Sequence, residues 1–165
     1  MRYNKIRQMD ISNGPGVRVS IFMQGCAFNC KNCFNPETHD FKGGKDLDDK
    51  SINKLIDLSN HEYISGLSIL GGEPLHPKNI DGTTKLAKIY KETYPDKNIW
   101  VWTGYKFDDE ILKDKEIFKY IDVLVDGQFE EKLYSPILKW KGSSNQRVID
   151  VKKSLKQNKI CLKES

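Results

Sequence analysis

Residues 17–34 read VRVSIFMQGCAFNCKNCF, an alternating apolar segment that runs directly into a loop with three cysteines. The alternation over residues 17–23 has the period of two that is typical of a β-strand. Cys26, Cys30 and Cys33 follow at intervals of three and two residues, so one short loop presents three thiols. An iron–sulfur cubane normally takes four thiolates. Three cysteines therefore predict a 4Fe-4S cluster with one iron open to an external ligand.

A zinc site is the alternative interpretation of the same cysteines. Structural zinc takes four ligands, usually arranged as two pairs. The fourth ligand would be Cys161 or one of the histidines, which are His39, His61 and His76. No second pair of ligands has zinc-like spacing, which favours the cluster. We expect Cys161 to be a free or half-buried thiol, because unpaired cysteines often behave as small hydrophobic side chains.

The composition of the chain indicates one globular domain over residues 1–165, with a core over about 3–150 and a basic tail over about 151–165. The 27 Lys and Arg residues exceed the 23 Asp and Glu residues by only four, so the chain lacks the strong positive field of a nucleic-acid-binding protein. No apolar run has membrane-spanning length, and the N-terminus lacks the apolar segment of a signal peptide. We therefore predict a cytoplasmic protein that has neither a nucleic acid nor a membrane as partner.

Strands and helices alternate along the chain, which favours an α/β fold with a mostly parallel sheet. Besides residues 17–23, short apolar runs predict three more strands, over residues 67–70, 99–102 and 123–125. Helical spacing of apolar residues predicts helices between the strands, over residues 51–58 and 83–94, and a broken helical stretch over 109–121.

A turn rich in glycine or polar residues follows each predicted strand. The four turns are Gln24–Cys26, Gly71–Pro74, Thr103–Tyr105 and Asp126–Gly127. Because the carboxyl ends of parallel strands meet at one edge, we expect these turns to face a single cleft. An eight-stranded barrel typically needs about 250 residues. The chain is long enough only for a partial barrel with an open side, which suits a large substrate.

Two motifs in this order resemble the radical S-adenosylmethionine (SAM) superfamily: the cysteine loop after the first strand, and Gly-Gly-Glu-Pro at 71–74 after the second. The run Gly-Pro-Gly-Val-Arg at 14–18 resembles the opening of glycyl-radical activating enzymes. Trp-Thr-Gly-Tyr at 102–105, Leu-Val-Asp-Gly at 124–127 and Gly-Ser-Ser-Asn-Gln at 142–146 narrow the match. With these runs the chain resembles activating proteins of anaerobic ribonucleoside-triphosphate reductase, from about residue 3 to about residue 149.

The resemblance implies a single-domain partial (β/α) barrel of the radical SAM type and a set of cofactor-binding residues. The three cysteines would hold three irons of the 4Fe-4S cluster, and SAM would chelate the fourth iron. Gly71, Gly72 and Glu73 would bind the amino group of SAM, and the backbone of residues 32–34 would lie against its adenine; these residues are Asn32, Cys33 and Phe34.

Two further residues at strand ends are candidates for contacts with the cofactor, and each also has a purely structural interpretation. Thr103 is a candidate SAM contact, but a threonine there is equally consistent with a helix cap. Asp126 is a candidate partner for the ribose or for a cation, or it closes a turn with Gly127. Trp100 and Trp102, two residues apart on one strand, share a face and are expected to pack.

The resemblance also implies a reaction and its partners. An electron from reduced flavodoxin or a similar donor would cleave SAM, and the 5′-deoxyadenosyl radical would take hydrogen from a glycine in the large subunit of the class III reductase. One alternative is an activator of another glycyl-radical enzyme, such as pyruvate formate-lyase. A non-catalytic zinc-binding adaptor is the alternative from a different class.

Overall fold

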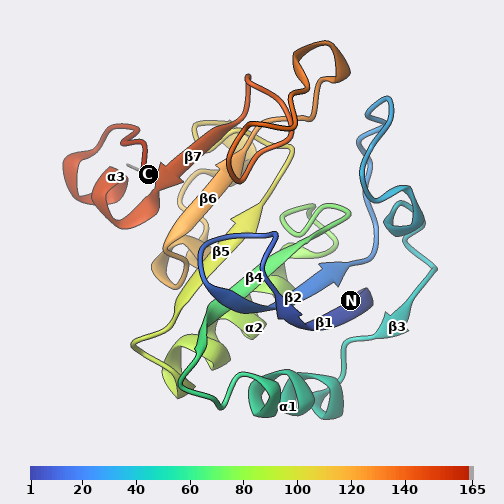
Figure 1. The fold of residues 1–165 in the computed structure, drawn as a ribbon, viewed down its shortest axis with the longest axis vertical. Coiled ribbons are helices and arrows are strands. Elements are labelled where there is room, and N and C mark those ends of the chain that lie inside the picture. Colours follow the sequence, from blue (N-terminus) through green and yellow to red (C-terminus); the bar gives the residue numbers. More distant parts are fainter. Residues whose placement is uncertain (164–165) are drawn as a thin grey trace.

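Seven strands form one mixed β-sheet with the order β3-β1-β2-β4-β5-β6-β7 in the computed structural model, which describes residues 1–163 (Figure 1). The strands are β1 (Arg2–Asp10), β2 (Val17–Met23), β3 (Lys45–Asp46), β4 (Ile64–Gly71), β5 (Asn98–Trp102), β6 (Val123–Asp126) and β7 (Arg147–Asp150). The central strands β2, β4, β5 and β6 are parallel to one another. These four are the strands that the apolar runs predict.

Strands at both sides of the parallel centre run antiparallel to it. β1 pairs with β2 and with β3, and β7 pairs with β6. The sheet is therefore mixed rather than mostly parallel throughout, while its centre confirms the predicted α/β class. β1 escapes prediction because its sequence, RYNKIRQMD, is largely charged and polar, and most of its side chains are at least partly exposed.

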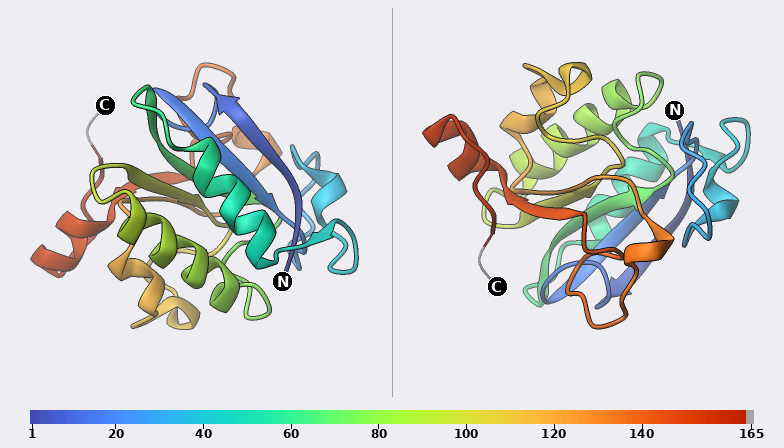
Figure 2. Two further views of the ribbon diagram at one scale, coloured as in Figure 1. Left: turned by 90° about the horizontal axis from the view of Figure 1, so that it is seen from below. Right: turned by 90° about the horizontal axis from the view of Figure 1, so that it is seen from above.

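The helices α1 (Asp49–Leu58) and α2 (Ile80–Thr93) cover one face of the sheet (Figure 2). They confirm the two predicted helices, and α2 ends just before Pro95. The broken stretch before β6 consists of two 3-10 turns, η2 (Glu110–Leu112) and η3 (Glu116–Lys119). A short helix, α3 (Val151–Gln157), follows β7. None of the helices within residues 1–163 combines the length and apolar composition needed to cross a lipid bilayer.

The two faces of the central strands differ in chemistry because successive side chains point to opposite faces. Toward the helices lies the main core, which includes Ile21, Ile69 and Val101, all fully buried. The opposite face carries polar, aromatic and aliphatic side chains, which include Ser20, Phe22, Ser68, Leu70, Trp100 and Trp102. The rings of Trp100 and Trp102 lie 5.7 Å apart, which confirms that they share a face and pack. This second face is available for a binding site.

A buried arginine fastens the segment after β1 to this second face. Arg18 donates to Ser68 Oγ at 2.7 Å, to the carbonyl of Leu67 at 3.0 Å and to the carbonyl of Pro15 at 3.2 Å. Burial lowers the pKa of Arg18 to about 10, so the guanidinium stays charged at neutral pH. Ser68 Oγ in turn donates to the carbonyl of Asn13 at 2.5 Å. The Gly-Pro-Gly run is thereby held against the sheet.

The packing of the central strands predicts the effect of one core substitution. We expect Ile69→Ala to lower the free energy of unfolding by about 2–5 kcal/mol, because it removes buried methyl groups and leaves a cavity. Ile137→Ala is the matched control, since Ile137 is 90% exposed, and its effect should stay within about 0.5 kcal/mol. Urea unfolding measures both values, and equal effects would contradict the placement of Ile69.

Candidate functional site

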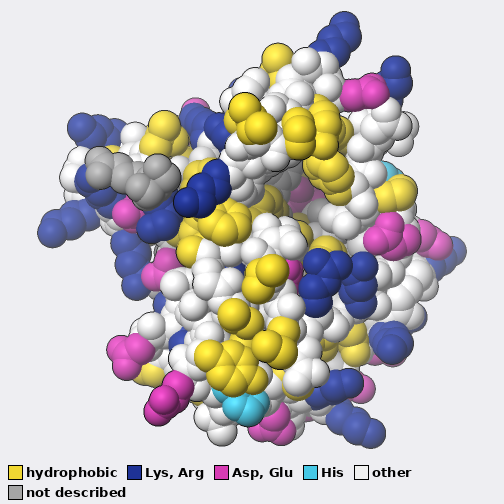
Figure 3. All heavy atoms as spheres, in the orientation of Figure 1, with side chains coloured by type: hydrophobic (Ala, Val, Ile, Leu, Met, Phe, Trp, Pro, Cys, Tyr) yellow, Lys and Arg dark blue, Asp and Glu magenta, His cyan; other side chains and the backbone are white. Residues whose placement is uncertain are grey.

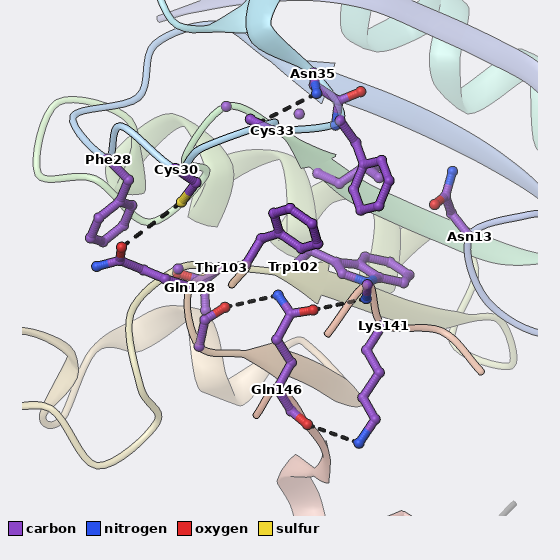
Figure 4. A pocket seen from close by; sticks show the side chains of 18 of the residues that line it. Asn13, Phe28, Cys30, Cys33, Asn35, Trp102, Thr103, Gln128, Lys141 and Gln146 are labelled. Atoms are coloured by element: carbon purple, nitrogen blue, oxygen red, sulfur yellow. Dashed lines mark hydrogen bonds between the residues drawn. The ribbon is translucent and has the colours of Figure 1, made fainter. Parts of the chain in front are cut away.

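A cavity of about 570 Å³ lies at the carboxyl edge of the parallel strands and extends over the second face of the sheet. Figure 3 shows it as a hollow in the surface, and Figure 4 shows its lining from close by. All four strand-end turns contribute lining residues, which include Cys26, Cys30, Cys33, Gly71, Gly72, Glu73, Thr103, Gly104 and Gly127. The prediction that these turns face one cleft is confirmed.

The cysteine loop is anchored at its root by the chain that returns from it. Gly25 N–H donates to the carbonyl of Thr38 at 2.6 Å, and Cys26 N–H donates to the carbonyl of His39 at 3.1 Å. The side-chain amide of Gln24 donates to the carbonyl of Asp40 at 2.8 Å. These bonds close the loop at its base, so that the cysteines between the two ends are presented to the cavity.

Each of the three cysteines on this loop is partly buried and has a distinct neighbour. Cys26 Sγ lies 3.7 Å from the carbonyl of Phe28. Cys33 N–H donates to the carbonyl of Cys30 at 3.3 Å, which tightens the loop between the second and third cysteines. The amide of Asn35 donates to Cys33 Sγ at 3.5 Å, which holds the chain after the third cysteine close to its sulfur.

The cavity disfavours free thiolates and therefore suits a cationic cofactor. Burial, together with the charges of Glu73 and Cys33, raises the pKa of Cys26 to about 11. Burial and the charge of Cys33 also raise the pKa of Cys30. Iron would stabilise the deprotonated sulfurs, because a thiol releases its proton to solvent when its sulfur coordinates a metal. Three sulfurs on one loop that line one cavity thus fit a 4Fe-4S cluster.

A cubane takes each cysteine on a different iron, so three sulfurs need not meet at one point. Within residues 1–163, no three His, Cys, Asp or Glu side chains converge closely enough to hold a single metal ion. The other zinc-ligand candidates are scattered. His39 lines the cavity, whereas His61 and His76 do not. Cys161 is a buried free thiol whose Sγ lies 3.5 Å from Gln157 Oε1, as predicted for an unpaired cysteine.

The Gly-Gly turn packs backbone to backbone against the root of the cysteine loop. Gly72 N–H donates to the carbonyl of Met23 at 2.9 Å, and Glu73 N–H donates to the carbonyl of Gly25 at 2.8 Å. Gly71 has φ of 111°, in the left-handed region that favours glycine. A Cβ on Gly72 would lie 2.6 Å from the carbonyl oxygen of Gly25. Both glycines are therefore required by the close approach of two chain segments.

The carboxylate of Glu73 is buried and joins the ends of two strands. Only 1% of the residue is exposed. Its oxygens accept hydrogen bonds from Gly104 N–H at 2.6 Å, from Thr103 Oγ1 at 2.7 Å and from Leu75 N–H at 2.9 Å. Thr103 thus bonds to Glu73 from the end of β5 instead of capping a helix. The side-chain oxygens of Glu73 are occupied within the protein, which leaves backbone groups of the turn to face the cavity.

Asp126 lies at the end of β6, where an arginine holds its carboxylate. Arg147 donates through Nε to Oδ1 at 3.0 Å and through Nη2 to Oδ2 at 2.6 Å. Phe107 N–H donates to Oδ2 at 2.8 Å. These bonds, together with Asp108, raise the pKa of Arg147 above its ordinary value. Asp126 is 1% exposed and is not among the cavity-lining residues, whereas the neighbouring Gly127 is.

The three residues expected beside adenine have different surroundings. Asn32 has φ of 56° and bonds through its side chain to Glu131, away from the cavity lining. Cys33 and Phe34 both line the cavity. The Phe34 ring lies 4.8 Å from that of Phe129, centroid to centroid. Of the three, Phe34 therefore presents an aromatic surface to the site.

The segment 128–146 forms a wall of the cavity that the sequence analysis only partly anticipates. Gln128, Phe129 and Trp140 from this segment line the cavity, and so does Trp102, which was expected only to pack. Gln146 shapes the wall, since its Oε1 accepts from the amide of Gly142 at 2.9 Å and its Nε2 donates to the carbonyl of Gly127 at 2.9 Å. The Gly-Ser-Ser-Asn-Gln run, which narrows the family resemblance, ends in this wall at Gln146.

Comparison with known proteins agrees with the geometry of this site. A family model described as "4Fe-4S single cluster domain" matches residues 12–149. A protein of Enterobacteria phage T4 is 40% identical over 148 residues, which cover 90% of this chain and 93% of the relative. Proteins of Salmonella typhimurium and Escherichia coli K12 are each 41% identical over 152 residues. The alignment covers 90% of this chain and 97% of each relative. All three are named anaerobic ribonucleoside-triphosphate reductase-activating protein, and this chain belongs to that family.

The buried position of Glu73 predicts a pH dependence of stability. Burial raises the pKa of Glu73 from 4.5 to about 7, although its three hydrogen bonds act to lower the pKa. Between these values the folded state keeps a proton that the unfolded state releases, so the free energy of unfolding falls as the pH rises through this window. Between pH 5.5 and pH 8 we expect the wild type to lose about 2 kcal/mol more than Glu73→Gln, which does not titrate.

Urea unfolding of both proteins at the two pH values measures this difference. The Gln side chain replaces one acceptor oxygen by an amide group that does not titrate. Its effect on the hydrogen bonds is therefore the same at both pH values and cancels from the comparison. Parallel pH profiles for wild type and variant would show that Glu73 has an ordinary pKa and is accessible to solvent.

Proposed function

We propose that this protein is a radical SAM enzyme that activates an anaerobic ribonucleoside-triphosphate reductase by forming a glycyl radical in its large subunit. The observation that carries the proposal is the meeting of the three-cysteine loop and the Gly-Gly turn at one cavity. Membership in the family of reductase-activating proteins supplies the partner. The geometry favours no second function.

Each part of the cavity receives a role in this proposal. Cys26, Cys30 and Cys33 hold three irons of a 4Fe-4S cluster. The backbone of Gly71 and Gly72 binds the amino group of SAM, because the absent side chains leave their carbonyls approachable. Glu73 completes this turn with its backbone, and its carboxylate fixes the turn to β5.

The adenine and ribose of SAM are assigned to the remaining wall and to the strand ends. The backbone of residues 32–34 lies against the adenine, and Phe34, which lines the cavity together with Cys33, offers the aromatic contact. Thr103 contacts SAM beside the Gly-Gly turn. Asp126 acts from outside the lining, since its salt bridge to Arg147 orients the backbone of Gly127 at the cavity.

Held by Cys26, Cys30 and Cys33, a cluster would supply the electron for reductive cleavage of SAM, and the resulting 5′-deoxyadenosyl radical would take hydrogen from the glycine. The protein positions SAM and keeps water from the reacting atoms. Aromatic side chains suited to this exclusion line the cavity, and they include Phe22, Phe28, Phe129, Trp102 and Trp140. Neither α1 nor α2 covers the second face (Figure 2), which leaves room for a polypeptide substrate beside the 128–146 wall.

The fold is consistent with a partial barrel of the radical SAM type. The strands β2, β4, β5 and β6 are neighbours in chain order, and α1 and α2 both lie on one face. A barrel wound from βα units has this arrangement, with the helices outside. We take residues 1–165 as one domain. We assign the protein to the cytoplasm, where thiols stay reduced, and reduced flavodoxin or a similar protein as its electron donor.

Electron paramagnetic resonance under anaerobic conditions tests the activity directly. The iron-reconstituted protein is mixed with a reductant, SAM and the reductase large subunit, and 5′-deoxyadenosine is assayed in parallel. We expect a glycyl-radical doublet together with the nucleoside. The nucleoside without the doublet would contradict the assigned partner, and a fully loaded protein that gave neither would contradict the reaction. Metal analysis of the same sample separates iron with acid-labile sulfide from zinc alone.

Cysteine variants test the ligand assignment. We expect alanine at Cys26, Cys30 or Cys33 to abolish 5′-deoxyadenosine formation and to lower the bound iron, because a ligand is lost in each case. Cys161→Ala is the matched control, since Cys161 lies outside the cavity lining, and it should retain both properties. Loss of iron from the Cys161 variant, or full iron and activity in any of the other three, would contradict the assignment.

A further inference from the structure

The side chain of Gln128 points at the sulfur of Cys30 across the cavity (Figure 4). Its Oε1 lies 3.8 Å from Cys30 Sγ, within hydrogen-bond distance for sulfur. The two residues are 98 positions apart in the chain, so only the fold brings them together. No other side chain within residues 1–163 hydrogen-bonds to the sulfur of any of the three loop cysteines.

The backbone around Gln128 is held by hydrogen bonds, while its side-chain amide contacts the sulfur of Cys30. The carbonyl of Gln128 accepts from Asn145 Nδ2 at 2.8 Å. The preceding Gly127 donates to the carbonyl of Tyr105 at 3.0 Å. Phe129, the next residue, also lines the cavity. The side chain of Gln128 is therefore presented to Cys30 from a backbone that is held at two points.

The chemistry of this contact changes when Cys30 becomes a metal ligand. A thiol can donate to the amide oxygen of Gln128, but a thiolate has no proton and can only accept. A half-turn of the terminal amide exchanges its oxygen for its NH₂ group without moving the backbone. The side chain then donates an N–H to the thiolate sulfur, which is a charge-assisted hydrogen bond.

We propose that Gln128 donates a hydrogen bond to the Cys30 thiolate and thereby raises the reduction potential of the cluster. This inference rests on the proposed function, because it requires Cys30 to ligate a 4Fe-4S cluster. Hydrogen bonds to the sulfurs are among the factors that set cluster potentials. Reduction adds negative charge, and an N–H beside the sulfur stabilises that charge. Gln128 is a positioning residue that acts through Cys30.

A redox titration of the reconstituted protein, followed by electron paramagnetic resonance of the reduced cluster, measures this effect. Gln128→Leu removes the donor, and Gln128→Glu keeps the shape but presents only acceptor oxygens and a negative charge. At the wild-type midpoint potential we expect the reduced-to-oxidised ratio to fall about threefold in Gln128→Leu. That fall corresponds to about 28 mV for one electron. Gln128→Glu should shift the midpoint further in the same direction.

Gln8→Leu is the matched control, because Gln8 is exposed on β1 and lies outside the cavity lining. It should keep the wild-type midpoint, and all four proteins should contain equal iron and sulfide. Wild-type midpoints in both Gln128 variants at full cluster content would overturn the inference. Failure of the wild type to cleave SAM would overturn the proposed function instead, since the midpoint measurement does not depend on turnover.

Discussion

The backbone contact between the Gly-Gly turn and the root of the cysteine loop is the constraint on which the site depends. The carbonyls of Met23 and Gly25 accept the amides of Gly72 and Glu73, which joins the ends of β2 and β4. The Glu73 carboxylate extends the connection to Gly104 at the end of β5. Three strand ends are thereby fixed relative to one another, and the spacing of cysteines, turn and cavity wall follows from that junction.

The junction buries ionisable groups, and this burial favours the binding of a cofactor that neutralises them. Desolvation of Cys26 and Glu73 raises the pKa of both groups, so the cavity disfavours negative charge. A buried charge without a partner lowers the free energy of unfolding. The iron ions of a cluster would neutralise the cysteine sulfurs. Glu73 instead accepts three hydrogen bonds from the protein.

The parallel centre of the fold was predictable because buried strands have continuous or alternating apolar residues. Strand β1 was not, since it flanks the parallel centre with charged side chains, and β7 is a short strand of mixed burial. In the site, the cysteines and glycines were recognisable from spacing and position. The engagement of Asp126 by Arg147 was not, because ion pairing between distant segments leaves no local pattern in the chain.

The sequence by itself determined the chemistry of this protein: three thiols at intervals of three and two, glycines after the second strand, and the runs that mark its family. These are local patterns, and local chemistry constrains them directly. Only the tertiary structure decided which groups share the cavity. It turned the carboxylate of Glu73 inward, excluded Asp126 from the lining and brought Gln128 to Cys30. Such contacts depend on the register and twist of the whole sheet, which no short stretch of sequence specifies.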